Sequence, residues 1–230
     1  MRLYRNPFLV LIPLLCLALA PATPAHFVTA DQFDFKALLG DPPADGSREH
    51  KEEVDRMLDL QASRTPEEEH RCREEEEVTA FAFSTVLGEE FNPKNLPTTA
   101  KVMAEASADS KGVANAAKLI WRRVRAPLAE PRIHSCVKLE HTASYPSGHA
   151  TRGMVWAMLL ADIFPEKRDA LLARGKQIGD DRFLAGMHYP SDVVAGQKLG
   201  AEIAAKLLGN AEFKAELEKA RAECATSVHH

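Results

Sequence analysis

The sequence predicts an all-α protein whose helices pack into a single domain. Apolar residues recur at helical spacing between residues 47 and 208, and helix-capping residues punctuate that pattern. No segment alternates apolar and polar residues as a half-buried strand does, and no internal repeat occurs. With 230 residues, of which 45% are apolar, the chain is long enough to bury one sizeable core.

The first 25 residues are predicted to be a secretory signal peptide. Two arginines precede an apolar run over residues 8–20, and small residues and prolines then lead to Ala25. The run is shorter than the roughly 18 residues that a membrane-spanning helix needs. We therefore expect cleavage after Ala25, with Ala22 as the alternative, and a periplasmic or secreted protein without stable membrane insertion. Cleavage would change the formal charge from −4 to −6, which disfavours nucleic acid as a partner.

An arm is expected between the signal peptide and the first helix. Residues 26–46 contain the turn formers Gly40, Pro42 and Pro43, which predict an extended segment laid over the domain. Ser47 can then cap the first helix.

Capping residues and prolines set the limits of the predicted helices. Thr65 and Glu68 form a capping box around Pro66, which starts a second helix. Pro165 ends a strongly apolar helix, and Pro190 opens the last one. The runs of glutamate after Pro66 are interpreted as a solvated helix face. The predicted helices cover residues 47–63, 66–87, 98–108, 112–124, 149–164, 166–184 and 190–208. The helical domain is placed at residues 47–222 and a C-terminal tail at residues 223–230.

Three cysteines remain after the signal peptide is removed: Cys72, Cys136 and Cys224. In an oxidising compartment they allow one disulfide and one free thiol, although the sequence does not select the pair. A staple through Cys136 would suit the irregular stretch around it, and a plain buried thiol is the equal alternative.

Two segments carry residues suited to binding a phosphoryl group. Lys118 and Arg125 lie about two helical turns apart and can project toward one anion from a helix face or its end. Ser147, Gly148 and His149 lie where a loop becomes a helix, and such a junction presents free backbone N–H groups to an anion. Taken alone, the first segment, which also contains Arg122 and Arg123, is better explained as a solvated cationic face, and the second is also explained as an ordinary helix cap.

A third segment supplies a histidine and a carboxylate with the spacing of a nucleophile and its orienting group. Asp192 follows His188 by four residues near a helix start, so its carboxylate can accept the Nδ1 proton and leave Nε2 unprotonated. Arg182 adds another cation. Together the three segments predict an enzyme of metal-free phosphoryl transfer, because they supply three cations, an anion cradle, two histidines and one carboxylate.

These motifs resemble the three-part signature of the phosphatidic acid phosphatase type 2 (PAP2) superfamily. The stretch from Ser144 to Thr151, the signal peptide and the length resemble its secreted branch, the class A bacterial non-specific acid phosphatases. The signature consists of Lys118 with six residues before Arg125, then Pro146-Ser147-Gly148-His149, then Arg182 with five residues before His188 and three before Asp192.

The resemblance implies a metal-independent acid phosphatase that needs no cofactor and acts on small phosphomonoesters. It implies that His188 attacks phosphorus, that Asp192 orients it, and that His149 protonates the leaving alkoxide and later activates water. It also implies resistance to chelators, an acidic bell-shaped pH profile, inhibition by vanadate and, as a weaker suggestion, a homodimer. The phosphate oxygens would be held by Lys118, Arg125, Ser147, Gly148 and Arg182.

Two positions depart from the family pattern. Ala126 stands where proline usually follows the first arginine, which puts the aim of Arg125 in question. Asp181 stands where serine usually precedes Arg182, and a carboxylate facing the phosphate would repel it. We therefore expect Asp181 to point away or to pair with a cation.

Two other functions remain open at this stage. A vanadium-dependent haloperoxidase would hold vanadate permanently in the same cradle, and a non-catalytic phosphate-binding protein would keep the cradle without turnover. An integral lipid phosphatase is disfavoured because the sequence has no set of apolar segments long enough to span a membrane.

Overall fold

The computed structural model describes residues 26–228, so the predicted signal peptide lies outside the described residues. Within this range the chain is helical and contains no strand, which confirms the predicted fold class. Short 3-10 turns lie at Ala30–Gln32, Glu75–Glu77, Ala80–Phe83 and Pro165–Lys167. The helices are α1 (Phe35–Leu39), α2 (Arg48–Ser63), α3 (Pro66–Glu74), α4 (Ser84–Leu87), α5 (Pro97–Trp121), α6 (Ala126–Ala129), α7 (Gly148–Ile163), α8 (Arg168–Leu184), α9 (Pro190–Gly209) and α10 (Ala211–Ser227).

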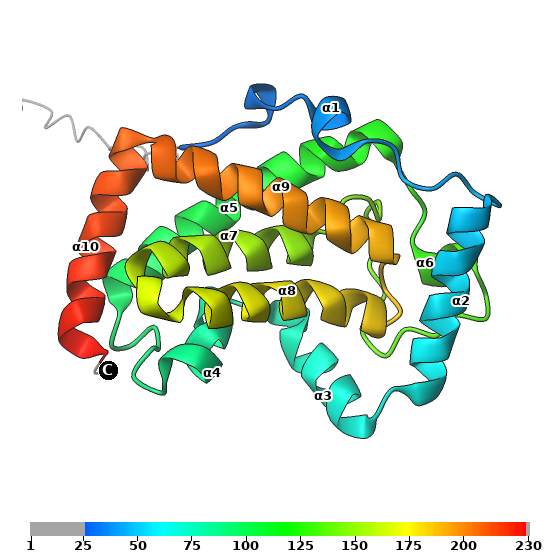
Figure 1. Ribbon diagram of the computed structural model, residues 1–230, viewed down its shortest axis with the longest axis horizontal. Coiled ribbons are helices and arrows are strands. Elements are labelled where there is room, and N and C mark those ends of the chain that lie inside the picture. The colour runs from blue at the N-terminus through cyan, green and yellow to red at the C-terminus, as the bar shows by residue number, and fades with distance from the viewer. Residues whose placement is uncertain (1–25, 229–230) are drawn as a thin grey trace, which may run out of the picture.

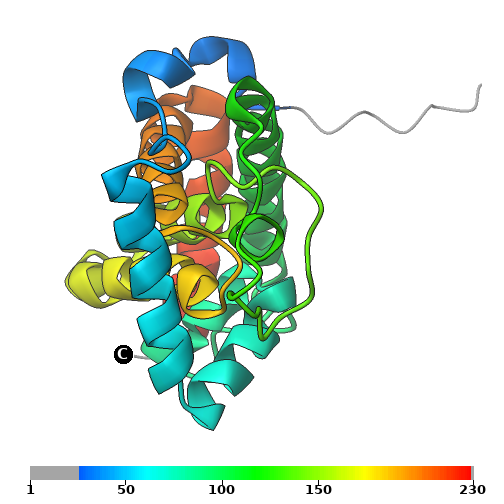
Figure 2. The same cartoon turned by 90° about the vertical axis from the view of Figure 1, so that its right-hand side faces the viewer.

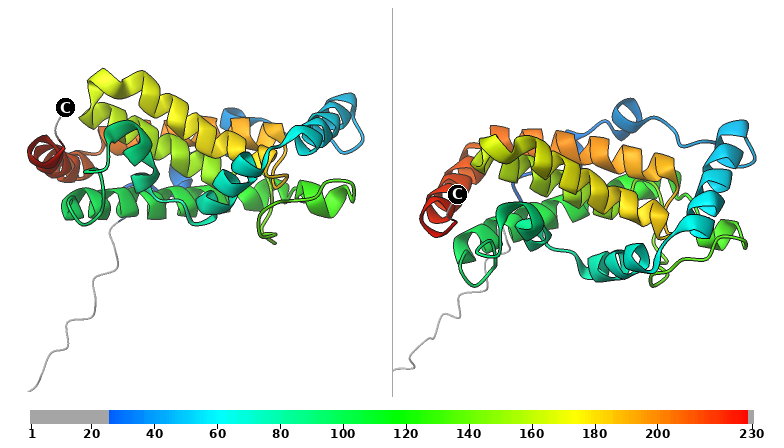
Figure 3. Two further views of the ribbon diagram at one scale, coloured as in Figure 1. Left: turned by 90° about the horizontal axis from the view of Figure 1, so that it is seen from below. Right: turned by 60° about the horizontal axis from the view of Figure 1, so that its bottom comes forward.

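The helix α7 forms the centre of the molecule, and α5, α8 and α9 pack around it (Figure 1). Its apolar side chains, among them Trp156 and Leu160, are buried in the main core. At one crossing the backbones of α7 and α8 touch, because a Cβ atom on Gly175 would lie 2.6 Å from the carbonyl oxygen of Gly153. The views in Figure 3 show these long helices side by side, with α10 across one end.

The N-terminal residues run over α5 and α9 before the chain turns into α2. Val28 and Phe35 are buried against the core, and the backbone N–H groups of Phe27 and Val28 donate to Asp109 on α5. At the opposite end from α10, the helix α2 crosses the tips of the bundle (Figure 2). Ser47 caps α2 by accepting from the N–H of His50, as the sequence predicts.

The helix predicted over residues 66–87 is wrong in its second half. The Thr65 capping box forms, but α3 ends at Glu74 and gives way to two 3-10 turns and α4. The glutamate run is not wholly solvated, because Glu75 is buried and its carboxylate lies 2.6 Å from the guanidinium of Arg174. This inward turn breaks the helix and brings the next backbone carbonyl, that of Glu76, to the candidate site.

The two helices predicted over residues 98–108 and 112–124 are one continuous helix, α5. Gly112 does not interrupt it, because the residue is exposed and a glycine inside a helix costs only about 1 kcal/mol. No threonine cap starts α5; the carboxylate of Glu223 accepts the N–H groups of Thr98 and Thr99 instead, at 2.9 and 2.8 Å. The helix ends at Trp121, earlier than predicted, where Arg122 adopts a left-handed conformation with φ 49°.

Three helices have no counterpart in the prediction. The short α1 lies within residues 26–46, where the sequence predicts an extended arm. The short α6 follows Arg125 directly, and α10 extends through Ser227, beyond the boundary at residue 222 that the sequence suggests. Residues 223–227 are therefore helical rather than a free tail: Cys224 is buried and Glu223 caps α5.

All three cysteines of the described range are free thiols. Cys72 and Cys224 are buried, and burial raises the pKa of Cys72 to about 12. Cys136, the cysteine considered for a disulfide staple, is a half-buried free thiol, so no staple forms through it. None of the helices from residue 26 to residue 228 is both long and apolar enough to span a membrane.

Candidate active site

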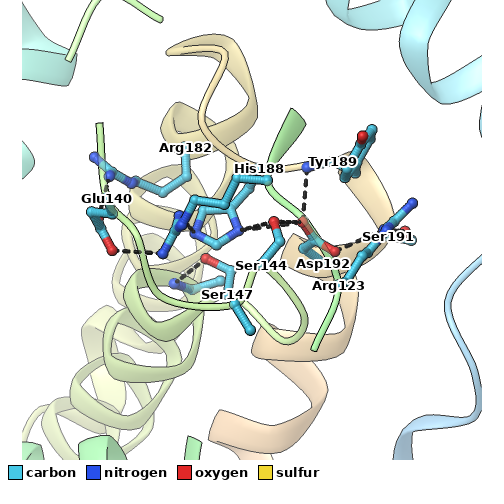
Figure 4. Close-up of polar contacts among 12 residues, drawn as sticks. Arg123, Glu140, Ser144, Ser147, Arg182, His188, Tyr189, Ser191 and Asp192 are labelled. Carbon is cyan, nitrogen blue, oxygen red and sulfur yellow. Dashed lines mark hydrogen bonds and ion pairs between the residues drawn. The ribbon is translucent and has the colours of Figure 1, made fainter. Parts of the chain in front are cut away.

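All the predicted site residues lie at the end of the bundle where α7 and α9 begin and α5 and α8 end. Figure 4 shows Ser147, Arg182, His188 and Asp192 among them. The loop between α6 and α7 covers this end of the molecule (Figure 2). The Ser147 carbonyl touches α9 so closely that a Cβ atom on Gly196 would lie 2.4 Å from it. The second and third predicted segments therefore meet because α7, α8 and α9 pack tightly at one end, and the first segment reaches them from the end of α5 and the start of α6.

His188 is buried, and its two ring nitrogens face partners of opposite kinds. The Nδ1 atom lies 3.3 Å from Oδ2 of Asp192, which accepts hydrogen bonds. The Nε2 atom lies 2.8 Å from Nη1 of Arg125, which can only donate. These partners place the proton on Nδ1 and leave a lone pair on Nε2. In this state an N–H group of Arg125 occupies that lone pair, so any group that reacts with Nε2 must first displace the arginine.

The carboxylate of Asp192 is held by more partners than the sequence indicates. Its Oδ2 also accepts from the hydroxyl of Ser144 at 2.5 Å and from the N–H of Tyr189 at 3.0 Å. Its Oδ1 accepts from Arg123 at 2.8 Å. A carboxylate with this many donors has little freedom to rotate, so it fixes the orientation of the His188 ring.

Sequence reasoning missed the role of Arg123, which it treated as part of a solvated cationic face. The side chain is buried and connects Asp192 to Glu53 on α2, at 2.8 Å to each carboxylate. Its guanidinium also stacks over the ring of Tyr189, 3.9 Å from the centroid. The available signal was the alternation of Arg123 and Arg125, which places both side chains on the same face of an extended segment.

Arg125 reaches the site despite the Ala126 departure. Arg125 occupies the position just before α6 and has an extended backbone there. Ala126 is buried beside Ile133 and Tyr189. The guanidinium is fixed by the carbonyl and the hydroxyl of Thr142, at 2.8 and 2.9 Å. Lys118 approaches from the end of α5, where its ammonium donates to the carbonyl of Ala143 at 2.5 Å.

A carboxylate that the sequence did not point to lies between the two arginines of the signature. Glu140 accepts from Arg125 at 2.6 Å and from Arg182 at 3.0 Å. Figure 4 shows Glu140 beside Arg182. The other donors of Arg182, Nε and Nη1, are buried and have no hydrogen-bond partner among the described residues. Glu140 thus occupies positions that anionic oxygens of a ligand would take, while two donors of Arg182 remain unsatisfied.

The start of α7 supplies the predicted anion cradle. The Ser147 hydroxyl caps the helix by accepting from the N–H of Ala150 at 3.4 Å, and the Ser147 N–H donates to the Asp192 carbonyl. Gly148 and His149 are the first two helical residues, so their N–H groups have no acceptor inside the helix. The cradle therefore consists of these two amides and the positive end of α7.

His149 is buried beside the cradle, and its Nε2 atom lies 3.2 Å from the carbonyl oxygen of Glu76. Because a carbonyl only accepts, the Nε2 atom carries a proton, and Nδ1 is the atom that remains to exchange one with a ligand. The broken helix after α3 is what brings this carbonyl to the site.

Asp181 behaves as predicted. Its carboxylate forms a bidentate pair with Arg71 on α3, with both distances at 2.8 Å. The carboxylate is thereby neutralised next to Arg182 without facing the cradle. In residues 26–228 no cluster of three or more His, Cys, Asp or Glu side chains is arranged to hold a metal ion.

The comparisons with known proteins agree with this geometry. Residues 100–209, which contain every site residue named in the signature, match the model of the PAP2 superfamily. The chain carries a PAP2 superfamily domain.

The relatives of this PAP2 domain support the predicted branch. A non-specific acid phosphatase of Providencia stuartii is 35% identical over 152 residues, covering 64% of this chain and 61% of that protein. One of Salmonella typhimurium is 34% identical over 153 residues, with the same coverage. A lipid A 1-phosphatase of Rhizobium johnstonii is 43% identical over 58 residues, which cover 25% of this chain and 24% of that protein. The chain spans about three fifths of the length of the acid phosphatases that it matches.

Burial and the clustered cations of the PAP2 site act on its titratable groups in one direction. Burial, together with Arg125, Lys118 and Arg182, holds the pKa of His188 well below the ordinary value. Burial and then Arg182 do the same to the pKa of His149. Burial and Arg125 lower the pKa of Lys118 to about 8. Without an anionic ligand, both histidines are therefore neutral around pH 7.

Replacing Glu140 by glutamine should strengthen the binding of vanadate or phosphate by about tenfold. The substitution removes the charge that competes with the ligand for Arg125 and Arg182. The two arginines are then open in a larger fraction of the ligand-free protein, so the ligand binds more tightly. The measurement is the inhibition constant of vanadate. Glu49→Gln on α2, which removes an exposed carboxylate, is the control and should change nothing. Weaker binding by the Glu140→Gln protein would contradict this competition.

Proposed function

We propose that this protein is a periplasmic or secreted acid phosphatase that hydrolyses soluble phosphomonoesters through a phosphohistidine, without a metal ion. The observation that supports it most is the His188 ring, whose Nε2 lone pair is directed at the guanidinium of Arg125 while Asp192 accepts from Nδ1. A phosphate-binding protein needs the cations but not a histidine held in this tautomer. The names of the acid phosphatase relatives support the same proposal.

In the first step, the substrate phosphate displaces Glu140 and enters between Arg125 and Arg182. The unsatisfied donors of Arg182, the ammonium of Lys118 and the amides of Gly148 and His149 then hold its oxygens. The Nε2 atom of His188 forms a bond to phosphorus while the bond to the leaving oxygen breaks. Protonated His149 donates to that oxygen, so that a neutral alcohol leaves.

In the second step, His149 is neutral and accepts a proton from water. The resulting nucleophile attacks phosphorus, the N–P bond breaks and phosphate is released. The cations around the cradle stabilise the charge on the equatorial oxygens in both steps, and this stabilisation is the largest contribution expected from the protein.

The proposal is tested by hydrolysis of phenyl phosphate in the presence of excess chelator, from acidic to neutral pH. We expect turnover that the chelator does not reduce. A folded protein that binds phosphate without turnover would contradict the phosphatase and favour a binding protein. Oxidation of bromide in the presence of vanadate and peroxide, without phosphatase turnover, would favour the haloperoxidase.

The pH dependence of kcat/KM should be bell-shaped with an optimum on the acid side of about 6.5, the reference pKa of histidine. The active free form needs His188 neutral and His149 protonated. Deprotonation of His149 ends activity on the alkaline side of the profile. Because the pKa of His149 is lowered, this loss occurs at a lower pH than an ordinary histidine would give. Protonation of His188 ends activity on the acid side. Because the pKa of His188 is also lowered, this loss occurs at a lower pH as well. An optimum above about pH 8 would contradict this assignment.

A further inference from the structure

Beside His149 lies a small cavity that is lined both by residues of the cradle and by residues outside the signature. It has a volume of about 160 Å³, enough for about five water molecules. Lys118, Gly148 and His149 form the side that adjoins the cradle. The rest is formed by Lys111, Ala114, Asn115 and Arg152, and by Glu140 and Thr142, which contact Arg125.

Arg152 gives this cavity an unpaired cation. Its Nε atom is buried, and neither a hydrogen bond nor an ion pair of this side chain occurs among residues 26–228. Burial lowers the pKa of Arg152, with a further lowering by Arg182, while the carboxylates of Glu140 and Glu77 act in the opposite direction. A partly buried guanidinium without a hydrogen-bonded anion is costly, so an anionic ligand would satisfy it.

The position of Arg152 relative to His149 defines which part of a substrate it would meet. The two residues are three apart on α7, so they share a helix face, and the charge of Arg152 helps to lower the pKa of His149. In the proposed mechanism His149 protonates the leaving oxygen. Arg152 and the exposed Lys111 are therefore on the leaving-group side of the scissile bond rather than around the transferred phosphoryl group.

Resting on the proposed function, we infer that this cavity binds a second phosphate on the leaving group, which makes phosphoanhydrides, with inorganic pyrophosphate as the simplest, favoured substrates. The His188 Nε2–P bond forms as the bridging P–O bond breaks, and the bridging oxygen takes the proton of His149 and departs as phosphate. Water then attacks the phosphohistidine, the N–P bond breaks, and His149 receives the proton of the water. Two phosphates result, and water is the only co-reactant.

An apolar leaving group has a different place available. Arg152 also borders a second cavity of about 390 Å³, lined by Phe81, Met103 and Trp156 among other residues. Phenyl phosphate carries no second phosphate and does not need the charge of Arg152, so it is the reference substrate for pyrophosphate.

The experiment compares kcat/KM for pyrophosphate and phenyl phosphate in the wild type and in Arg152→Gln. The ratio of the two values should fall by about tenfold or more in the variant, the effect of losing one charge-assisted contact. Arg48→Gln removes the same charge from an exposed position on α2 and should leave the ratio unchanged. A ratio in Arg152→Gln within about twofold of the wild-type ratio would overturn the inference.

A measurement on the wild type alone keeps the inference testable if Arg152→Gln does not fold. Methylenediphosphonate, which cannot be hydrolysed at its bridge, should inhibit phenyl phosphate hydrolysis about tenfold more tightly than phosphate does. Equal inhibition would overturn the inference while leaving the phosphatase intact. Absence of any phenyl phosphate turnover would instead contradict the proposed function, and calorimetric binding of methylenediphosphonate would still test the cavity.

Discussion

His188→Ala should lower kcat/KM for phenyl phosphate on the order of 10⁴-fold or more, the largest effect expected of any single substitution. The variant lacks the Nε2 atom that forms the bond to phosphorus, and no other imidazole can replace it. Asp192 stays in place in the variant because Ser144, Tyr189 and Arg123 hold its carboxylate. It does not act as the nucleophile. The cations and the α7 amides remain, which is why the variant should still bind phosphate or vanadate.

The covalent intermediate gives this prediction a second readout. Radiolabelled substrate quenched in alkali should leave phosphate on the wild-type protein and none on His188→Ala, because a phosphoramidate resists base. His70→Ala is the matched control, since His70 is an exposed histidine on α3 and its loss should affect neither turnover nor labelling. A folded His188→Ala protein that retains more than about 1% of the wild-type rate would exclude His188 as the nucleophile.

His149→Ala should lower turnover of an alkyl phosphate by about 10²- to 10⁴-fold, whereas p-nitrophenyl phosphate should lose far less in its first step. An alkoxide is a poor leaving group and needs the proton that His149 supplies. Nitrophenolate leaves readily without it. The size of the effect therefore depends on the basicity of the leaving group if His149 is the acid.

The same variant should separate the two steps of the reaction. With p-nitrophenyl phosphate it should release a rapid burst of nitrophenol followed by slow turnover, because no base remains to activate the water that attacks the phosphohistidine. His134→Ala serves as the control, since the His134 side chain is exposed. Equal losses for alkyl and nitrophenyl substrates would mean that His149 binds phosphate and does not transfer the proton.

Much of the helical framework follows from local sequence signals. The caps at Ser47 and Thr65 form as predicted because each cap is a contact between residues three apart. The limits at Pro165 and Pro190 follow from the missing proline N–H and the fixed proline φ. These features depend only on residues that are close together in the sequence, so the sequence alone predicts them.

The failures of the helix prediction have long-range causes. The α5 helix begins where Glu223, more than a hundred residues away, accepts its first N–H groups. The α3 helix stops because Glu75 turns inward to Arg174 on α8. Neither partner is adjacent in sequence, and the local composition in both places favours a different boundary.

The sequence by itself predicted which residues meet at the candidate site. Asp192 follows His188 by about one helical turn, and the spacing of the three signature segments carries the resemblance from which the nucleophile, its orienting group and the phosphate ligands are predicted. The tertiary structure alone decided how the site is held and filled. Arg123 holds the Asp192 carboxylate, Glu140 pairs with Arg125 and Arg182, and Arg152 lies with His149 at the same cavity. These roles arise where separate helices and loops meet, and the packing of side chains, not their order along the chain, brings such groups within hydrogen-bond distance.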